Sequence, residues 1–357
     1  MERVRVGLIG LGEVAQVIHL PVLRNLEDRY EIAAICDVSP ALLAHVGDAY
    51  GIEQRYDRAE DLVAQDDLDA VLVLNSDEYH AEHAILALKH GKHVLIEKPM
   101  CLNLREAEEI IAARDEAGVQ VMVAYMRRFA PAFLEAVELV RQLPQILYAR
   151  VRDIIGPNRL MIDQSSVVLR PNDISQEMSE DRMARAGRLV NEAIGDAPPD
   201  IIAAYRLLLG LGSHDLSAMR ELIGMPERVV SASHWNGGRF MTATFGYDGF
   251  NAVFEMGVDQ QRRFDAHLEV FGESTQIRVQ FDTPYIRHLP TTLAVSETVD
   301  EAYSERVIRP TFKDPYTFEL EHFHDVVCGN AAPKTPPEDS IDDLKLFGDI
   351  IAELRRA

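Results

Sequence analysis

A chain of 357 residues is longer than one ordinary hydrophobic core supports, so we expect two domains. Its composition, 47% hydrophobic and 26% charged, excludes a disordered or low-complexity protein, and no apolar run approaches the roughly 20 residues that a membrane span requires. The formal net charge of -22 disfavours contact with a phosphate backbone, which argues against nucleic acid as a partner.

The N-terminal part of the chain passes directly into a strand pattern and lacks the apolar stretch and cleavage site of a signal peptide, so we expect a cytoplasmic protein. Residues 1–124 alternate short apolar runs with helical patterns, which predicts a parallel sheet covered by helices on both faces. The runs are apolar throughout, as is usual for central parallel strands. They cover residues 4–9, 32–36, 70–74, 94–96 and 119–123.

The first predicted strand runs into a turn with the pattern Gly-x-Gly-x-x-Ala, which is typical of a dinucleotide-binding loop. Gly10 permits the tight turn, Gly12 lets the backbone approach a pyrophosphate, and Ala15 lets helix and strand pack closely. The N-terminus of the next helix then faces the anion. We therefore expect cofactor contacts from Gly10, Gly12, Glu13, Val14 and Ala15.

Asp37 follows the second strand, where a carboxylate can accept hydrogen bonds from both ribose hydroxyls of the cofactor. Its alternative role is to cap the following helix, but Ser39-Pro40 already supplies an N-cap and an N1 proline. Because Asp37 would repel a 2′-phosphate and residues 38–40 contain no arginine, NAD is favoured over NADP.

Two further helices are predicted before residue 124. One covers residues 78–90 and ends at Gly91, and the other begins after Asn103 as N-cap and ends at Gly118. The segment Tyr79–Met100, YHAEHAILALKHGKHVLIEKPM, resembles the Gfo/Idh/MocA family, which includes glucose-fructose oxidoreductase and inositol dehydrogenases. Weaker similarity occurs at residues 124–131 and 212–215, and little is found between about 155 and 205.

The resemblance implies an α/β Rossmann domain plus an α+β domain with a large, mainly antiparallel open sheet, and an active site in the cleft between them. We place the NAD-binding domain at residues 1–124 and the substrate-binding and oligomerisation domain at residues 125–337. The sheet often forms an oligomer interface in the family, so a homodimer or homotetramer is expected.

The resemblance also implies that Lys98 lies beside the nicotinamide and the reacting carbinol, where partial desolvation would lower its pKa and suit it to proton transfer. The alternative is an exposed lysine in a turn. Glu97 is expected to orient this turn. His80 is expected near the cofactor, or else as a helix cap. The cofactor contacts predicted outside the glycine loop and Asp37 are Asn75, His80, Glu97 and Lys98.

His214 matches the family histidine that shares proton transfer, and a pKa near neutrality suits it to that role. A buried histidine bonded to the backbone is the alternative. Many family dehydrogenases carry an aspartate four residues earlier, one helical turn away, where this chain has Gly210. We considered Asp153, Arg152 and Asp173 as replacements for that carboxylate.

The substrate contacts predicted besides Lys98 and His214 are Tyr125, Arg128 and Asp153. Core packing and structural ion pairing are the alternatives for Tyr125 and Arg128. Residues 156–205 form a long insertion with a predicted helix near residues 179–194. We expect it to cover the substrate cleft or reach a neighbouring subunit, with a solvated decoration as the alternative.

After about residue 220, polar and apolar residues alternate, which predicts antiparallel strands. The runs are residues 240–245, 250–258, 267–271 and 276–281, with a hairpin turn at Tyr247-Asp248-Gly249. An amphipathic helix follows at residues 341–354. We expect the C-terminal helix, residues 338–357, to pack on the NAD-binding domain.

The three cysteines are far apart and the histidines form no convincing ligand set, so no metal site is expected. The sequence predicts an NAD-dependent dehydrogenase that transfers a hydride from a secondary alcohol of a sugar, inositol or glycoside, with Lys98 and His214 handling the proton. One alternative is an NAD-using glycosidase or lyase with transient oxidation. Another is a catalytically inactive NAD-binding regulatory protein, which the missing carboxylate at Gly210 would fit.

Overall fold

The computed structural model describes residues 3–356, which divide into two compact units. The first unit comprises the chain up to Ala124, together with Ser166–Ala193 and Glu319–Ile341. The second comprises Tyr125–Ser165, Ile194–Phe318 and the chain from Asp342. Each unit contains one sheet with its own buried core.

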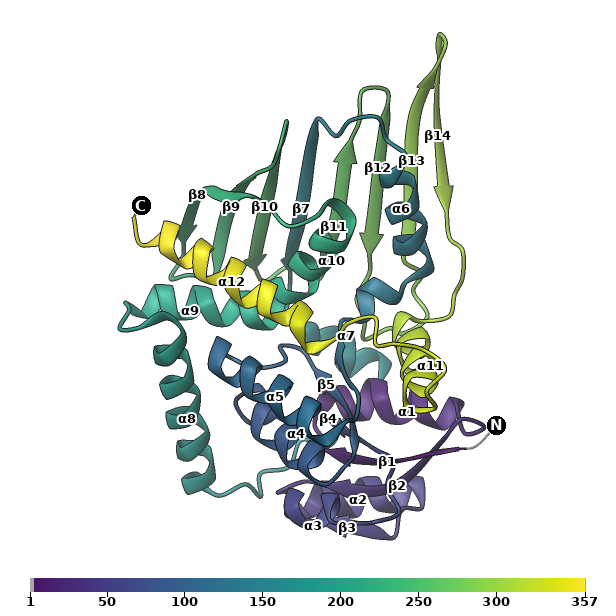
Figure 1. The fold of residues 1–357 in the computed structure, drawn as a ribbon, viewed down its shortest axis with the longest axis vertical. Coiled ribbons are helices and arrows are strands. Elements are labelled where there is room, and N and C mark those ends of the chain that lie inside the picture. The colour runs from purple at the N-terminus through teal and green to yellow at the C-terminus, as the bar shows by residue number, and fades with distance from the viewer. Residues whose placement is uncertain (1–2, 357) are drawn as a thin grey trace. The chain divides into compact units, whose positions relative to one another are not determined.

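The first unit is built on a parallel sheet of six strands in the order β3-β2-β1-β4-β5-β6 (Figure 1). The apolar side chains of β1, β4 and β5 are almost fully buried, as expected of strands covered on both faces. This confirms the predicted Rossmann arrangement. The strands are β1 (Val4–Ile9), β2 (Tyr30–Cys36), β3 (Gln54–Tyr56), β4 (Ala70–Val73), β5 (His93–Glu97) and β6 (Val121–Ala124).

The helices of the first unit begin and end where the local sequence favours it. Ser39 Oγ accepts a hydrogen bond from Leu42 N at the start of α2, and Gly51 ends that helix with a φ of 69°. Asn103 and Gly118 play the same parts in α5. The helices between the strands are α1 (Leu20–Asn25), α2 (Pro40–Tyr50), α3 (Ala59–Val63), α4 (His80–Lys89) and α5 (Leu104–Ala117).

Residues Ser166–Ala193 of the long insertion belong to the first unit, a destination that the sequence did not predict. Their helix α8 (Gln176–Ile194) is held to α4 and α5 by ion pairs (Figure 1). Arg105 Nε lies 2.5 Å from Glu192 Oε1, and Arg185 pairs with Glu82. This part of the insertion therefore adds a helix to the first unit.

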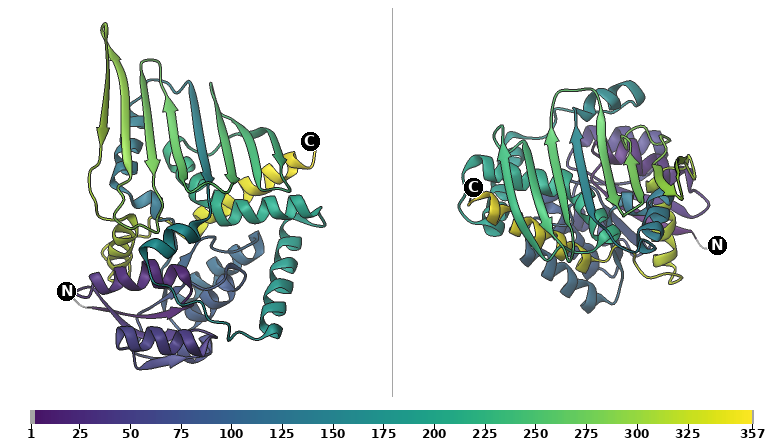
Figure 2. Two further views of the ribbon diagram at one scale, coloured as in Figure 1. Left: turned by 180° about the vertical axis from the view of Figure 1, so that it is seen from behind. Right: turned by 90° about the horizontal axis from the view of Figure 1, so that it is seen from above.

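The second unit contains one eight-stranded sheet in the order β14-β13-β12-β11-β7-β10-β9-β8, labelled in Figure 1 and drawn from two other sides in Figure 2. Neighbouring strands are antiparallel except for β7 and β10, which run parallel, so the prediction of a large, mainly antiparallel sheet is confirmed. The strands are β7 (Tyr148–Ile155), β8 (Arg228–Trp235), β9 (Phe240–Gly246), β10 (Asn251–Val258), β11 (Phe264–Phe271), β12 (Thr275–Phe281), β13 (Thr292–Val299) and β14 (Ala302–Ile308).

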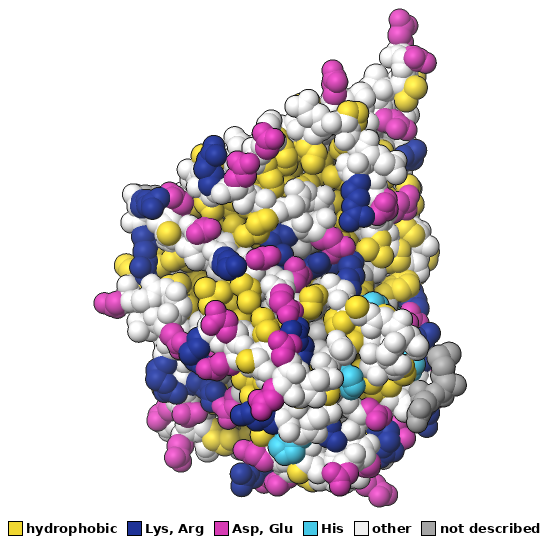
Figure 3. Space-filling model, viewed as in Figure 1, with side chains coloured by type: hydrophobic (Ala, Val, Ile, Leu, Met, Phe, Trp, Pro, Cys, Tyr) yellow, Lys and Arg dark blue, Asp and Glu magenta, His cyan; other side chains and the backbone are white. Residues whose placement is uncertain are grey.

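One face of this sheet is apolar and carries helices, and the other is charged. The helix α6 (Pro131–Arg141) packs on β12, with the rings of Phe133 and Phe281 6.5 Å apart. On the opposite face, Arg152 Nε lies 2.9 Å from Asp265 Oδ2. Figure 3 is drawn from the side of the sheet that carries α6, and it shows acidic and basic side chains interspersed over the surface on that side.

The C-terminal helix α12 (Pro337–Leu354) differs from our expectation, because the chain from Asp342 belongs to the second unit. Asp343 in this helix accepts hydrogen bonds from Tyr125 Oη at 2.7 Å and from Arg220 Nε at 2.9 Å. These buried bonds join the apolar side chains of the helix in packing it on the second unit. Among the described residues, no helix combines the length and apolar character that crossing a membrane requires.

Candidate functional site

The glycine loop after β1 has the backbone geometry that a dinucleotide requires. Gly10 has a φ of +97°, and a Cβ at this position would lie 2.5 Å from the backbone nitrogen of Asn75. At Gly12 an added Cβ would meet no heavy atom of the described residues within 4 Å, so the backbone is open to a ligand. Ala15 is fully buried, which allows close packing of helix on strand. The loop therefore fits a pyrophosphate.

Asp37 lies beside this loop at the end of β2. Its Oδ2 accepts a hydrogen bond from Leu11 N at 2.8 Å, and its Oδ1 accepts one from Ser39 N at 2.9 Å. Burial raises the pKa of Asp37, and these two hydrogen bonds partly offset that effect. Each carboxylate oxygen has a second lone pair, so both can still accept a ribose hydroxyl.

Lys98 is half-buried at the carboxyl end of β5, and its neighbour Glu97 is firmly held. Glu97 Oε1 lies 2.7 Å from His19 Nε2, and Glu97 Oε2 accepts a hydrogen bond from Lys98 N at 3.1 Å. Burial alone would raise the pKa of Glu97, but the hydrogen bond and charge of His19, together with the charge of Lys98, lower it overall. His19 is the last residue of the π-helix Ala15–His19, which follows the glycine loop. The His19–Glu97 contact therefore connects that helix to the turn that carries Lys98.

His80 connects two other parts of the same sheet edge. Its Nδ1 lies 2.8 Å from Pro99 O, and its Nε2 lies 2.9 Å from Asn75 O. The ring is 2% exposed, so within the first unit it joins the end of β4 to the turn at Lys98. Through these two bonds His80 positions the turn at Lys98. Asn75 Nδ2 lies 3.0 Å from His83 Nδ1.

His214 is half-buried in the first turn of α10 (Ser213–Ile223) in the second unit. A π-helix, Leu208–Gly212, precedes it directly. Gly210 lies in this π-helix and His214 in the α-helix that continues it, four residues and about one helical turn further along the chain. Gly210 is exposed, and a Cβ there would meet no heavy atom of the described chain within 4 Å.

Asp153 belongs to a buried charge cluster rather than to an open surface. Arg127 Nη2 lies 3.0 Å from Asp153 Oδ2, and Arg127 also pairs with Asp215. Both carboxylates are fully buried, and the guanidinium carbon lies 4.9 Å from the ring centroid of Phe281. Burial raises the pKa of Asp215 well above its usual range. The burial and pairing argue against the substrate contact that we expected from Asp153.

Tyr125 and Arg128 are also buried, and their polar groups meet partners inside the second unit. Tyr125 is 2% exposed and bonds to Asp343, while Arg128 Nε lies 2.5 Å from Glu221 Oε2. These are the packing and ion-pairing alternatives considered for the two residues.

The other two candidate replacements for the missing carboxylate are also engaged elsewhere. Arg152 pairs with Asp265 on the charged face of the second sheet. Asp173 lies in the first unit, where the Ser39 hydroxyl lies 2.8 Å from both of its carboxylate oxygens and donates one shared hydrogen bond to them.

The sequence analysis missed Arg127 and Asp215 as a buried pair. Asp215 directly follows His214, and Arg127 lies in the segment 124–131 that showed family similarity. The sequence did offer one signal, namely that each charge stands in a largely apolar segment. Charged residues are seldom buried without a partner, so such a position indicates a buried pair. The partner of each charge lies 88 positions away, and one sequence does not reveal such a pairing.

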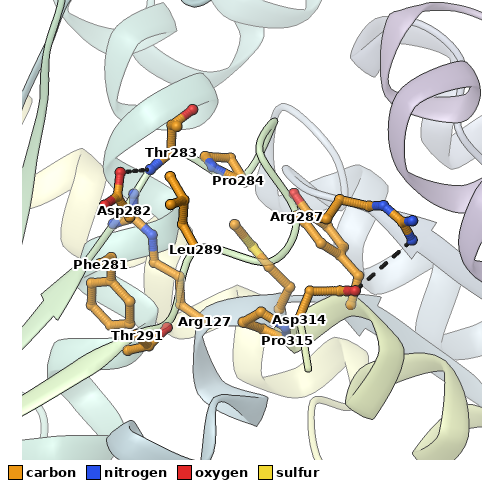
Figure 4. A pocket seen from close by; sticks show the side chains of 12 residues that line it. Arg127, Phe281, Asp282, Thr283, Pro284, Arg287, Leu289, Thr291, Asp314 and Pro315 are labelled. Atoms are coloured by element: carbon orange, nitrogen blue, oxygen red, sulfur yellow. Dashed lines mark hydrogen bonds and ion pairs between the residues drawn. The ribbon is translucent and has the colours of Figure 1, made fainter. Parts of the chain in front are cut away.

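A small cavity in the second unit lies next to Arg127 and has a volume of about 30 Å³ (Figure 4). It has room for a water molecule or two but not for a sugar. In Figure 4, Arg287 and Asp314 face each other beside it, with Nη1 and Oδ2 3.9 Å apart. This cavity is therefore not a candidate substrate site.

Comparison with known proteins gives consistent results. The model of the oxidoreductase family with an NAD-binding Rossmann fold matches residues 4–125. Inositol 2-dehydrogenase 3 of Saccharopolyspora erythraea is 35% identical over 331 residues, which cover 92% of this chain and 86% of that protein. D-xylose 1-dehydrogenase (NADP(+)) 2 of Haloferax volcanii is 26% identical, with 95% and 94% covered.

Among solved structures, the aldose-aldose oxidoreductase of Caulobacter crescentus complexed with glycerol shares the fold, with a TM-score of 0.75 and 21% identity over 99% of this chain and 98% of that one. The glycine loop, Asp37 and the Lys98 turn lie within the segment that the family model matches. The chain therefore belongs to the Gfo/Idh/MocA family of oxidoreductases, whose N-terminal domain is an NAD-binding Rossmann fold.

Proposed function

We propose that this protein catalyses reversible hydride transfer between NAD and a secondary alcohol of a sugar, inositol or glycoside. The relative from Saccharopolyspora erythraea, which matches nearly the whole chain, is an inositol 2-dehydrogenase. The observation that carries the proposal is the Glu97–His19 pair, 2.7 Å apart, which fixes the turn bearing Lys98 relative to the cofactor loop. A lysine at this strand end suits an oxidoreductase that must hold a hydroxyl near its cofactor.

When bound, NAD supplies the hydride acceptor, and the residues of the chain orient the alcohol and manage its proton. The Lys98 ammonium donates a hydrogen bond to the carbinol oxygen and stabilises negative charge on it as the proton leaves. The imidazole of His214 accepts that proton, because an imidazole is the side chain best suited to proton exchange near neutral pH. In the reverse direction the same two groups return the proton to the oxygen.

NAD rather than NADP is the proposed cofactor. Asp37 presents an ionisable carboxylate beside the glycine loop, where it accepts hydrogen bonds from hydroxyls and repels a phosphate. Because the relative from Haloferax volcanii carries NADP in its name, membership of the family does not decide the preference.

The proposal is tested by mixing the protein with NAD and a panel of sugars, inositols and glycosides while recording the NADH absorbance band. We expect at least one secondary alcohol to yield NADH, and little turnover with NADP. Conversion of a glycoside without accumulation of NADH would favour transient oxidation instead. Binding of NAD without conversion of any compound would favour a regulatory protein.

A further inference from the structure

The segment Leu169–Asp173 of the insertion, which we call the strap, lies along the cofactor loop of its own unit. Gln16 Nε2 donates a hydrogen bond to Leu169 O at 3.1 Å, and Gln16 Oε1 accepts one from Leu169 N at 2.9 Å. The next residue, Arg170, has its Nε 3.0 Å from Glu13 Oε2. Glu13 lies within the glycine loop itself, so the strap adjoins the site proposed for the cofactor.

The strap ends with Asp173 at the beginning of α2, an eleven-residue helix. Asp173 Oδ2 accepts a hydrogen bond from Ala41 N at 3.0 Å, and both carboxylate oxygens lie 2.8 Å from Ser39 Oγ. The backbone N–H groups at a helix N-terminus favour an anion. The hydrogen bonds from Ala41 and Ser39 lower the pKa of Asp173, so the carboxylate is ionised at neutral pH.

Asp37 and Asp173 therefore bond to the same short stretch of chain, at Ser39. Ser39 N donates its hydrogen bond to Asp37, while the Ser39 hydroxyl bonds to Asp173. The charge of Asp173 contributes to the raised pKa of Asp37, which reflects how near the two carboxylates are. A phosphate attached to a ribose held by Asp37 would enter this stretch and would need these same donors.

We propose that Asp173 is a second determinant of the preference for NAD over NADP. This inference rests on the proposed cofactor site at the glycine loop and Asp37. Asp173 accepts the hydrogen bonds of the Ser39 hydroxyl and the Ala41 N–H, the two donors that would otherwise bind a 2′-phosphate. Its negative charge also repels that phosphate. Removing Asp37 alone leaves this barrier in place, so both carboxylates must be changed before NADP binds well.

The test is calorimetric titration of NAD and NADP into five variants of the full chain. Three carry one substitution, Asp37→Ser, Asp173→Asn or Asp173→Ala, and two combine Asp37→Ser with either change at Asp173. Relative to Asp37→Ser alone, Asp37→Ser/Asp173→Ala should bind NADP more tightly by on the order of tenfold or more, with NAD affinity changed less than about threefold. Asp173→Asn keeps an acceptor for Ala41 and loses the charge, so its effect should be intermediate. Glu180→Gln removes an exposed charge elsewhere on the insertion and should change neither affinity.

Two results would overturn the inference. One is an NADP affinity that Asp173→Ala leaves unchanged in the Asp37→Ser background. The other is an equal change in the affinities for NAD and NADP, which would mean that the strap only supports the loop. In either case NAD still binds and the proposed function stands, whereas a chain that binds neither dinucleotide contradicts the proposed function itself.

Discussion

At the scale of single residues, Lys98 and His214 carry the proposed proton transfer. Lys98→Ala and His214→Ala should each lower turnover by on the order of a hundredfold or more while NAD affinity stays nearly constant, because both groups act on the moving proton. Their effects should be less than additive, since both serve one proton path. Steady-state kinetics and calorimetry measure the two quantities.

Lys89→Ala removes an exposed lysine from α4 and serves as the control for loss of positive charge. If His214→Ala turned over at the wild-type rate across pH 6 to 9 while Lys98→Ala was inactive, His214 would have a structural role only.

Glu78 makes stability depend on pH. Burial, together with the neighbouring carboxylate of Asp77, raises the pKa of Glu78 to about 7, and Arg182 only partly offsets this. The folded state therefore holds this proton more tightly than the unfolded state, so the group favours folding at low pH and loses that effect as pH rises from about 4.5 to about 7.

Glu78→Gln should accordingly match the wild type below about pH 4 and exceed its free energy of unfolding by roughly 1–3 kcal/mol at pH 8. Urea titrations across this range measure the difference. Glu116→Gln, at an exposed position of α5, is the matched control and should show no such trend. A Glu78→Gln variant less stable than the wild type at pH 8 would mean that the Arg182 pair outweighs burial.

Local geometry could be predicted where a motif fixes the backbone, as in the tight turn at Gly10, the open backbone at Gly12 and the place of Asp37 beside them. The turn at Glu97 and Lys98 was predicted from the family resemblance, but the His19 pair that holds it was not. The role of Asp153 could not be predicted, because its partner Arg127 reaches it only through the tertiary fold. The sequence alone does not distinguish a carboxylate that contacts a substrate from one that pairs with a buried arginine.

At the scale of secondary structure, the π-helix Leu208–Gly212 contains two glycines near His214 whose surroundings differ. A Cβ at Gly210 enters open space, whereas one at Gly212 would lie 3.2 Å from Met256 Sδ. Gly210→Ala should therefore raise the free energy of unfolding by up to about 1 kcal/mol, through reduced freedom of the unfolded chain. Gly212→Ala should lower it, because the packing against Met256 must shift.

Urea unfolding of the two variants, compared with the wild type, provides the measurement. An equal change in the free energy of unfolding for both variants would contradict the difference between open space at Gly210 and close packing at Gly212. Unchanged kinetics of Gly210→Ala would further show that the position has no contact with the substrate.

Five strands of the first sheet were predicted, because their apolar runs are short, continuous and bounded by turn residues. The sixth, β3, was not predicted, because its sequence Gln-Arg-Tyr is not an apolar run. In the second sheet, β9 to β12 were predicted from alternation, whereas β7, β8, β13 and β14 were not. β7 contains Arg150, Arg152 and the buried Asp153, so its pattern does not read as one apolar face. β14 is largely exposed, and its sequence lacks the signal of a buried side.

At the scale of the whole molecule, the chain crosses between the two units several times, which the linear division at residue 124 did not anticipate. The insertion returns to the first unit through polar contacts such as Asp173 with Ser39 and Arg105 with Glu192. The C-terminal helix joins the second unit through Asp343. Such long-range polar pairs leave no periodic trace in a sequence, so the destination of these segments could not be predicted from it.

The central claim is direct hydride transfer from a carbinol carbon to NAD. It is tested most directly with a substrate identified in the panel and carrying deuterium at that carbon, followed by mass spectrometry of the nicotinamide product. The account predicts NADH with one deuterium per molecule, at a rate that falls sharply in Lys98→Ala. Formation of unlabelled NADH, or release of the deuterium to water, would contradict it.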